Sequence, residues 1–351
     1  MIFRNRFTAP LIVAGMLFAA TSEADACTRV VYAGNNGNVA TGRTLDWRTP
    51  IPTDLYIMPR GIARESYDTE EGIKWTSRYG SVVSVGYDMG VSEGLNEAGL
   101  SVNILYLPGT VYTRDHETRK KMSATVWALY VLDNFATVDE AVAQLRKDEF
   151  YIDAPAMPEG SASTTHMAIS DSTGNNAIIE YIDGELSIHV GKEYKVLTNL
   201  PTYDSQLAVN NYWKEVGGTH MLPGTNRSSD RFVRASFYVD VLPPTLTQNE
   251  ALAGVFGIIR NCSVPMGISF PDSPEISTTQ WRSVADQKGM VYYLEMTLNP
   301  AVVWVNLHKA DLRPGSPQRK LDIKISDTDI LAGDVTAKFK PTTPFKPFFH
   351  M

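Results

Sequence analysis

The sequence predicts an α+β fold in which antiparallel sheets are covered by helices. Strand-like and helix-like segments come in separate runs (strands, helices, strands, helices, strands) instead of alternating one by one. No repeat, low-complexity tract or Gly/Ser linker divides residues 27–310. The chain has 351 residues, 43% of them hydrophobic and 20% charged, which is enough for one large domain or two modest ones. Its continuity favours a single domain over residues 27–351.

Residues 1–26 have the composition of an export signal. Arg4 and Arg6 give a positive start, residues 9–20 are apolar, and Ala24-Asp25-Ala26 forms a small-residue cleavage site. The apolar run is too short to span a bilayer, which needs about 20 residues. We therefore expect a protein that is exported, to the periplasm or beyond, begins at Cys27 and has no stable membrane insertion.

Cys27 also allows a different interpretation, a lipid-anchored binding protein whose first mature cysteine carries the lipid. Lipoprotein processing generally requires a leucine-like residue three positions before that cysteine, and this position is occupied by Ala24. Ordinary signal cleavage fits better.

Charge and cysteine content exclude several classes of protein. The net charge is −7 and stays so after removal of residues 1–26, so there is no basic footprint for nucleic acid. The only other cysteine, Cys262, is interpreted as a small buried hydrophobe. The six histidines lack metal-ligand spacing, and we expect neither a metal nor a cofactor.

The strongest local signal is a hairpin at the expected mature N-terminus. Residues 28–33 and 39–47 read as strands around Asn36-Gly37, a dipeptide typical of tight hairpin turns. If Asn36-Gly37 is a two-residue loop, the register places Cys27 opposite Asp46.

The remaining elements follow in order along the chain. Strands are predicted at 82–87, 100–105, 167–170, 177–182, 186–190, 195–198, 280–285, 291–297 and 302–307, and helices at 123–133, 141–146, 204–212 and 230–242. Thr137 with Glu140, and Thr247 with Glu250, have the spacing of capping boxes, the second opening a further helix. From about residue 336, three prolines and three lysines predict an extended arm, either disordered or wrapped on a neighbouring molecule.

A cysteine at a processed N-terminus can be a nucleophile without a histidine. Its own α-amine, with an ordinary pKa of about 8, can accept the thiol proton. Asp46 is placed to hold that amine, and Arg43 is a cation that would stabilise the thiolate. Three positions apart, these two side chains would point to opposite faces of a regular strand. If both serve Cys27, we expect a bulge, or a strand end, between Thr44 and Leu45.

A second enzyme class stays open, a histidine-assisted thiol protease or transpeptidase. None of the six histidines sits in a recognisable cysteine-protease signature, and His166 is the one singled out as a possible base.

Four separated motifs resemble the choloylglycine hydrolase family, the bile salt hydrolases and penicillin V acylases among the N-terminal-nucleophile (Ntn) hydrolases. They cover essentially the whole chain after residue 26. They are Cys27-Thr28-Arg29 with Thr41-Gly42-Arg43-Thr44-Leu45-Asp46-Trp47, Leu95-Asn96-Glu97-Ala98-Gly99-Leu100, Val196-Leu197-Thr198-Asn199-Leu200-Pro201, and Leu222-Pro223-Gly224 with Ser229-Asp230-Arg231-Phe232-Val233-Arg234-Ala235.

The resemblance implies a four-layer αββα sandwich with two antiparallel sheets and hydrolysis of a linear amide. It implies Cys27 as nucleophile, with Asp46 at its amine and Arg43 at its thiolate. It further implies Asn199 and the backbone N–H of Tyr106 as oxyanion donors, and Arg231 as part of the charge environment. Family members are often tetramers, so a homotetramer is an expectation on the same ground.

Within the family, the sequence looks like the exported Gram-negative branch. Tyr106 stands where penicillin V acylases often carry Tyr, and Trp47, Tyr87 and Tyr106 are candidates for binding a flat apolar acyl group. Penicillin V acylase-like specificity is therefore favoured. Conjugated bile salts and acyl-homoserine lactones remain the alternatives.

Overall fold

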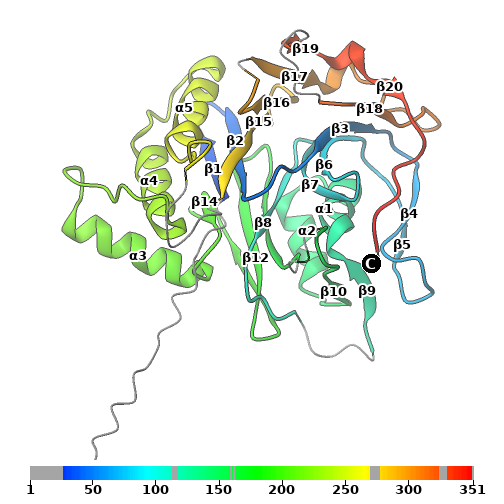
Figure 1. The fold of residues 1–351 in the computed structure, drawn as a ribbon, viewed down its shortest axis with the longest axis horizontal. Coiled ribbons are helices and arrows are strands. Elements are labelled where there is room, and N and C mark those ends of the chain that lie inside the picture. The colour runs from blue at the N-terminus through cyan, green and yellow to red at the C-terminus, as the bar shows by residue number, and fades with distance from the viewer. Residues whose placement is uncertain are drawn as a thin grey trace, which may run out of the picture.

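Two large β-sheets face each other between two layers of helices (Figure 1). The computed structural model describes residues 27–112, 118–158, 160, 163–268, 277–299, 301–323 and 330–349. The predicted export segment lies outside the described residues, as do His116 and His350.

The first sheet carries the hairpin that begins at Thr28. Its strands, in spatial order, are β14 (Val196–Thr198), β1 (Thr28–Ala33), β2 (Val39–Trp47), β15 (Thr278–Asp286), β16 (Val291–Met296), β17 (Val302–Asn306) and β19 (Gly333–Asp334). All neighbours are antiparallel except the edge pair β17–β19.

The second sheet has nine strands and is antiparallel throughout. Its order is β13 (Glu185–Val190), β12 (Asn176–Ile182), β11 (Thr165–Ser170), β8 (Ser101–Tyr106), β7 (Gly90–Asn96), β6 (Ser81–Gly86), β3 (Thr53–Met58), β18 (Arg319–Leu321) and β20 (Lys340–Pro341). Two small pairs complete the strands, β4 (Ala63–Glu65) with β5 (Lys74–Thr76), and β9 (Lys120–Ser123) with β10 (Phe150–Asp153).

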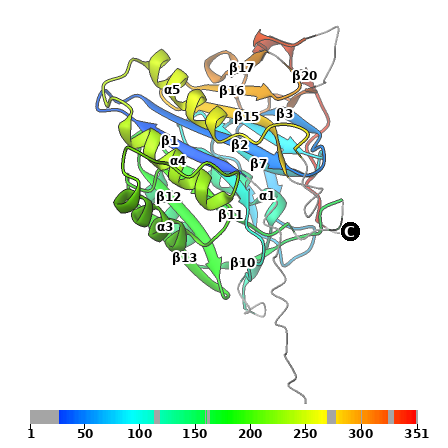
Figure 2. The ribbon, with the colours of Figure 1, turned by 60° about the vertical axis from the view of Figure 1, so that its left-hand side comes forward.

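Helices cover the outer face of each sheet and complete the four layers. On the first sheet lie α4 (Ser228–Val241) and α5 (Gln248–Asn261), in front of β1 and β2 in Figure 2. Helix α3 (Tyr203–Val216) packs against α4, and all three helices are on the left of Figure 1. On the second sheet lie α1 (Ala124–Asn134) and α2 (Val138–Leu145). The α+β sandwich with two antiparallel sheets is thus confirmed, in an αββα arrangement.

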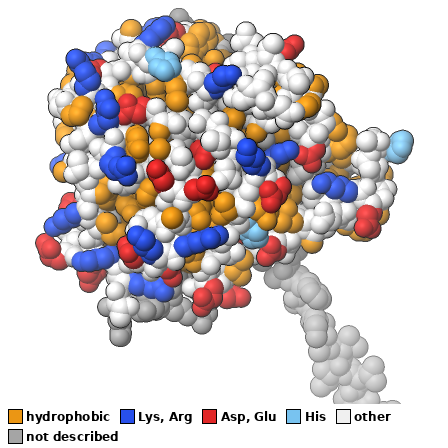
Figure 3. All heavy atoms as spheres, turned by 180° about the vertical axis from the view of Figure 1, so that it is seen from behind, with side chains coloured by type: hydrophobic (Ala, Val, Ile, Leu, Met, Phe, Trp, Pro, Cys, Tyr) orange, Lys and Arg blue, Asp and Glu red, His pale blue; other side chains and the backbone are white. Residues whose placement is uncertain are grey.

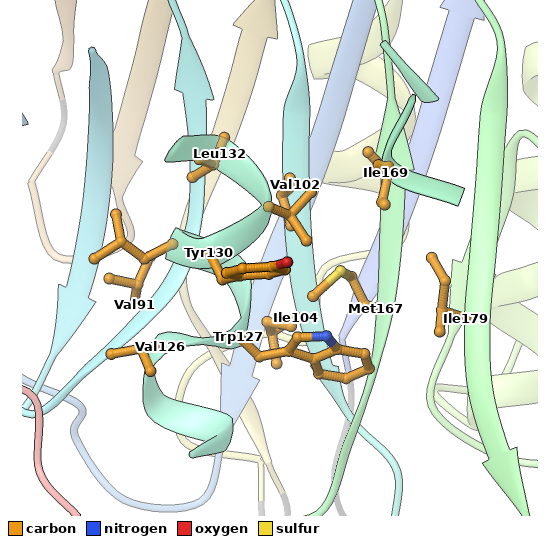
Figure 4. Packing of buried hydrophobic residues seen from close by; sticks show 14 of the residues in the cluster. Val91, Val102, Ile104, Val126, Trp127, Tyr130, Leu132, Met167, Ile169 and Ile179 are labelled. Carbon is orange, nitrogen blue, oxygen red and sulfur yellow. The ribbon is translucent and has the colours of Figure 1, made fainter. Parts of the chain in front are cut away.

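Helix α1 is buried on nearly every side because its sequence is apolar on nearly every side. Trp127 and Leu132 bring the helix onto β7 and β8, and the same cluster includes Val102 and Ile104 of β8 and Met167 of β11 (Figure 4). Its N-terminus is capped by Ser123, whose hydroxyl accepts from the N–H of Thr125.

Both predicted caps are present. Thr247 and Glu250 form the complete reciprocal capping box at the start of α5. At α2, the Thr137 side chain accepts from the N–H of Glu140, while the Glu140 carboxylate accepts from the N–H of Ala136.

The predicted register of the first hairpin is wrong by one residue. Thr28 pairs with Thr44, which places Cys27 opposite Leu45 and not opposite Asp46. The reason is a longer loop. The N–H of Gly34 still bonds the carbonyl of Asn38, so three residues make the turn, with Gly37 at a φ of 77°.

Side chains in the loop fix this longer turn. The amide groups of Asn36 and Asn38 both donate to the carbonyl of Leu246, at 2.7 and 3.0 Å. This carbonyl lies just before α5, so a distant segment sets the register.

The C-terminal segment is extended, as expected, but it packs on its own chain. Residues 340–341 form strand β20 on β18, and Phe345 is only 7% exposed within the core under α1. Disorder, one of the two anticipated alternatives, does not describe residues 336–349, and packing on a neighbouring molecule stays a prediction.

On the face shown in Figure 3, basic and acidic side chains are interspersed and form no large patch of one charge. Among the described residues, no helix has both the length and the apolarity required to cross a bilayer.

Candidate active site

Cys27 lies just before the first residue of β1, where side chains from both faces of the first sheet contact it. It is 3% exposed. On the face turned toward the second sheet, Nη2 of Arg43 is 3.7 Å from its Sγ. On the helix face, Nη1 of Arg231 donates to the Cys27 carbonyl and to the Thr28 hydroxyl, both at 2.6 Å.

The side chains of β2 alternate regularly between these two faces. A Cβ on Gly42 would lie 2.4 Å from Val255 of α5, so even-numbered positions face the helices. Arg43, one position on, reaches Glu93 and the carbonyl of Ile104 in the second sheet.

The expected break in β2 near Thr44 is therefore absent. The strand runs unbroken from Val39 to Trp47, and the irregularity lies in its neighbour, where β15 inserts Gln280 between the partners of Leu45 and Asp46. Arg43 and Asp46 do point to opposite faces. Arg43 reaches the Cys27 sulfur with its guanidinium, whereas Asp46 contacts that sulfur through its main-chain carbonyl.

Asp46 is completely buried beside Arg231. Its Oδ2 accepts from the Thr44 hydroxyl at 3.0 Å and lies 3.9 Å from Nη1 of Arg231. Burial raises the pKa of Asp46 to about 6, although the charge of Arg231 opposes the shift. Burial also lowers the pKa of Arg231. The contact recorded between Asp46 and the Cys27 sulfur is through the Asp46 carbonyl, at 3.9 Å.

Asn199 follows β14 and faces the main chain of Cys27. Its Oδ1 accepts a short hydrogen bond from the Cys27 N–H and a longer one from Arg231, at 3.4 Å. Its Nδ2 donates to the carbonyl of Tyr106 at 2.6 Å. Cys27, Asn199 and the end of β8 therefore meet at one point.

Glu93 supplies a buried carboxylate to this site, and the sequence analysis did not identify it. Its Oε2 accepts from Arg43 at 2.9 Å and from Asn103 at 3.1 Å, and its Oε1 accepts from the Tyr292 hydroxyl at 2.5 Å. Arg43 also lies over the ring of Trp281, 5.0 Å from its centroid.

The electrostatic balance at Arg43 follows from these neighbours. Burial works to lower the pKa of Arg43, but the Cys27 sulfur and the Glu93 carboxylate outweigh it and raise that pKa. Arg43 is thus a fixed cation held between two potential anions. No local motif marks Glu93, because its partners come from β2, β8 and β16.

A pocket with a volume of about 160 Å³ opens at Cys27. Trp47, Tyr87 and Tyr106 all line it, and the rings of Trp47 and Tyr106 meet edge to face at 5.1 Å. The other walls include Met89, Val91, Ile104, Ala124, Thr125, Met157 and Pro158. The pocket is mostly apolar, with the thiol and Arg43 at one place on its surface.

Histidines do not contribute to this pocket. The four in the described part of the chain line none of it. His166 is fully buried, with Nδ1 2.8 Å from Glu180, and His189 contacts Asp204. Over the same residues, no three metal-ligating side chains converge.

Cys262 is remote from the pocket wall. Its sulfur contacts the carbonyl of Arg231 at 3.7 Å, and burial raises the pKa of this thiol to about 11. It is a protonated, buried side chain that packs under α4.

Comparison with known proteins agrees with this geometry. Residues 27–328 match the linear amide C–N hydrolases of the choloylglycine hydrolase family. The chain is 43% identical over 345 residues to a penicillin V acylase of Pectobacterium atrosepticum, covering 92% of each protein. It is 25% identical over 303 residues to a bile salt hydrolase/transferase of Bifidobacterium longum, covering 79% of this chain and 93% of that protein.

Solved structures give the same result. A penicillin V acylase from Agrobacterium tumefaciens superposes with a TM-score of 0.85 at 46% identity, over 93% of this chain and all of that one. A conjugated bile acid hydrolase from Clostridium perfringens has the same fold, with a TM-score of 0.72 at 22% identity over 86% and 98% of the two chains. From its sequence and its fold, the chain belongs to the choloylglycine hydrolase family of linear amide C–N hydrolases.

Proposed function

We propose that Cys27, once cleavage after Ala26 frees its α-amine, is the nucleophile that hydrolyses a linear amide through a thioester. The observation that carries this is a buried thiol on the wall of an apolar pocket, with a guanidinium 3.7 Å from its sulfur. That the family match begins at Cys27 supports the same starting point.

In the first half of the reaction, the α-amine takes the thiol proton while the sulfur attacks the amide carbon. The carbonyl electrons move to the oxygen, and the resulting oxyanion is bound by Nδ2 of Asn199 and the N–H of Tyr106. Collapse breaks the C–N bond, and the ammonium proton passes to the leaving nitrogen. A thioester and a free amine result.

In the second half, water attacks the thioester and gives a proton to the α-amine. The C–S bond breaks, the acid leaves, and the sulfur recovers its proton from the ammonium. In this scheme Asp46 holds the amine, Arg43 stabilises the thiolate, and Arg231 keeps the Cys27 carbonyl and Asn199 in place.

Pocket size favours a small aromatic acyl group. An apolar cavity of roughly 150 Å³ holds one benzene ring, and this pocket measures about 160 Å³. A phenoxyacetyl group, as in penicillin V, fits that space with its ring against Trp47 and Tyr106. The four fused rings of a bile salt exceed this volume and would extend through the open mouth of the pocket, so penicillin V acylase-like specificity is the better match.

Burial of Cys27 also argues against the lipid-anchored alternative. Its sulfur is turned toward Arg43 inside the pocket, where an attached diacylglycerol would displace the walls. The proposal therefore includes export, with cleavage at Ala26–Cys27, to give a periplasmic or secreted protein. On the separate ground of the family resemblance, it also includes a homotetramer as the expected assembly.

One experiment tests the central claim. Release of amine is measured side by side from penicillin V, glycine- and taurine-conjugated bile salts, and acyl-homoserine lactones. We expect penicillin V to be preferred, the Cys27→Ala variant to be inactive, and the Cys262→Ala variant to retain activity. Hydrolysis by Cys27→Ala would overturn the proposal, and preference for a bile salt or a lactone would overturn the substrate assignment.

Intact mass and light scattering test maturation and assembly. Purified protein lacking residues 1–26, with no added mass, fits the proposed maturation. A diacylglyceryl adduct, or a fully active enzyme that keeps its export segment, contradicts it. A scattering mass of four chains fits the tetramer.

A further inference from the structure

The C-terminal segment reaches the wall of the active-site pocket. Phe345 anchors it, because its ring is buried against Tyr56 at a centroid distance of 5.8 Å. The N–H of Phe345 also donates to Oε1 of Gln318 at 3.0 Å. The chain is therefore fixed three residues before the position that contacts the pocket.

Phe348 joins two separate walls of the pocket through its main chain. Its N–H donates to the carbonyl of Met89 at 3.0 Å, and its carbonyl accepts from the Thr125 hydroxyl, also at 3.0 Å. Met89 lies in the turn between β6 and β7, whereas Thr125 lies in the first turn of α1. Both residues line the pocket. One peptide segment thus connects the turn to the helix.

The turn held in this way has a conformation that needs support. Tyr87 and Asp88 have φ values of 53° and 57°. Residues other than glycine adopt this left-handed backbone conformation only at a cost in free energy. The Asp88 carboxylate accepts from the Tyr56 hydroxyl and from Nζ of Lys320 at 3.3 Å. Tyr87 and Met89, on either side of Asp88, both face the pocket.

The last link lies one residue further on. The Phe349 carbonyl accepts from the Tyr67 hydroxyl at 3.0 Å, and the two rings lie 5.1 Å apart. Phe348 is therefore held from both sides, by Phe345 and by Phe349.

We propose that residues 345–349 form a clasp that sets the width of the acyl pocket and thereby determines which acyl groups the enzyme accepts. This rests on the proposed function in one respect, that the pocket holds the acyl group. Opening the clasp frees the Tyr87–Met89 turn from α1, so small acyl groups lose contact and bulkier ones gain room. The atoms around the Cys27 sulfur are not touched.

Two truncations form a matched pair, one ending at Phe349 and one ending at Lys346. The first removes only residues 350–351, and the second also removes residues 347–349 of the clasp but keeps its Phe345 anchor. For the shorter chain we expect KM for a phenoxyacetyl amide to rise about tenfold, the combined effect of two ordinary hydrogen bonds. Its kcat stays within about threefold, and its selectivity shifts toward acyl groups with two rings. Equal KM and selectivity in the two truncations would overturn the proposal.

Substitutions in the full chain guard against a truncation that fails to fold. Phe348→Pro removes both the phenyl ring and the N–H that donates to the Met89 carbonyl. Phe348→Ala also removes the ring but keeps that N–H. With folding checked by thermal melting, we expect the KM rise for Phe348→Pro only. Identical behaviour of this pair contradicts the clasp.

Binding without turnover separates this proposal from the proposed function. Phenoxyacetic acid, the expected acid product, is titrated while tryptophan fluorescence is followed, since Trp47 lines the pocket. Loss of the clasp should weaken its Kd about tenfold, and an unchanged Kd counts against the clasp. Failure of the proposed function shows differently, as an untruncated enzyme that hydrolyses no amide.

Discussion

The guanidinium of Arg43 connects the Cys27 sulfur to a buried carboxylate. Its Nη2 lies 3.7 Å from Sγ of Cys27, and its Nη1 lies 2.9 Å from Oε2 of Glu93. The two side chains that flank the guanidinium come from different sheets, so this contact ties Cys27 to both halves of the sandwich. Its geometry decides how well a thiolate is stabilised.

Replacing Arg43 by lysine should therefore lower activity although the charge is kept. The guanidinium faces Glu93 with Nη1, and it faces the Ile104 carbonyl and the Cys27 sulfur with Nη2, whereas a lysine has a single nitrogen for all three. We expect kcat/KM to fall by roughly 10²-fold, in the range of one lost electrostatic contact at a reacting group.

Thiol alkylation checks the reason for that loss. In a Cys262→Ala background, where only Cys27 can react, the rate of labelling by iodoacetamide should fall at neutral pH in Arg43→Lys. An unchanged rate would mean that Arg43 acts on substrate and not on the sulfur.

Glu93→Gln should destabilise the protein even though glutamine has nearly the same shape. Arg43 would lose its buried carboxylate partner, and breaking a buried ion pair costs about 3 kcal/mol. Chemical denaturation gives the free energy of unfolding. Glu70→Gln, at a carboxylate with a 97% exposed side chain, is the control and should leave it unchanged.

A double-mutant cycle with Arg43→Gln identifies the pair as the cause. The loss in the double variant should be smaller than the two single losses together. Strict additivity would assign the effect of Glu93 to its other partners, Asn103 and Tyr292.

The pH dependence of activity should have an acidic limb that belongs to Asp46. Burial raises the pKa of Asp46 to about 6 in the folded protein, above its ordinary value near 3.9. If the carboxylate must be ionised to hold the α-ammonium of Cys27, activity falls as the pH drops through 6. The added charge of that ammonium draws the limb to pH 6 or below.

Stability should change with the opposite sign. Because the pKa of Asp46 is higher in the folded than in the unfolded protein, protonated Asp46 favours folding. Its contribution to the free energy of unfolding is complete below pH 4 and is lost as the pH rises through 6. In Asp46→Asn both effects should disappear, leaving a low and flatter pH–rate profile. An unaltered acidic limb in that variant would assign the limb to another group.

The cap of α5 offers a test of local stability that is independent of catalysis. Thr247→Ala removes the side chain of a complete capping box and should cost about 1 kcal/mol of unfolding free energy. Thr202→Ala is the matched control, since Thr202 precedes α3 without a side-chain cap bond. A similar loss in both variants would argue against the cap.

Most helices and most of the longer strands could be predicted because their side chains carry the required period, but β3 and β7 were missed, and the reason is clear for β7. Gly90 and Gly94 interrupt its pattern. A Cβ on Gly94 would lie 2.6 Å from the Val82 carbonyl and 2.8 Å from Leu132 of α1. The glycine is there because α1 packs closely on this strand, and its absence of a side chain hides the strand from a pattern search.

The site shows the same division between local and distant information. Asp46 and Arg43 lie within one short motif, so their proximity to Cys27 could be anticipated, whereas their register could not. The register depends on the bonds from Asn36 and Asn38 to Leu246, 208 residues or more away in sequence. Glu93 was missed for the same reason, since each of its partners is on another strand.

Asn199 tests the proposed oxyanion site most directly, because its two ends have different partners. Oδ1 accepts from the Cys27 N–H, while Nδ2 donates to Tyr106 and carries a second hydrogen for the oxyanion. Asn199→Ala removes both ends, whereas Asn199→Asp keeps the acceptor toward Cys27 and loses the donor. In each case kcat should fall about 10²- to 10³-fold, with KM changed much less, because an oxyanion forms only in the transition state.

Comparing the two variants of Asn199 separates transition-state binding from simple positioning of Cys27. If Asn199 only positions the nucleophile, Asn199→Asp should keep most of the activity that Asn199→Ala loses, since it retains the acceptor for the Cys27 nitrogen. If the donor is what matters, the two variants should be almost equally slow. Titration with phenoxyacetic acid should give wild-type affinity in both, because the apolar walls near Trp47 are unchanged.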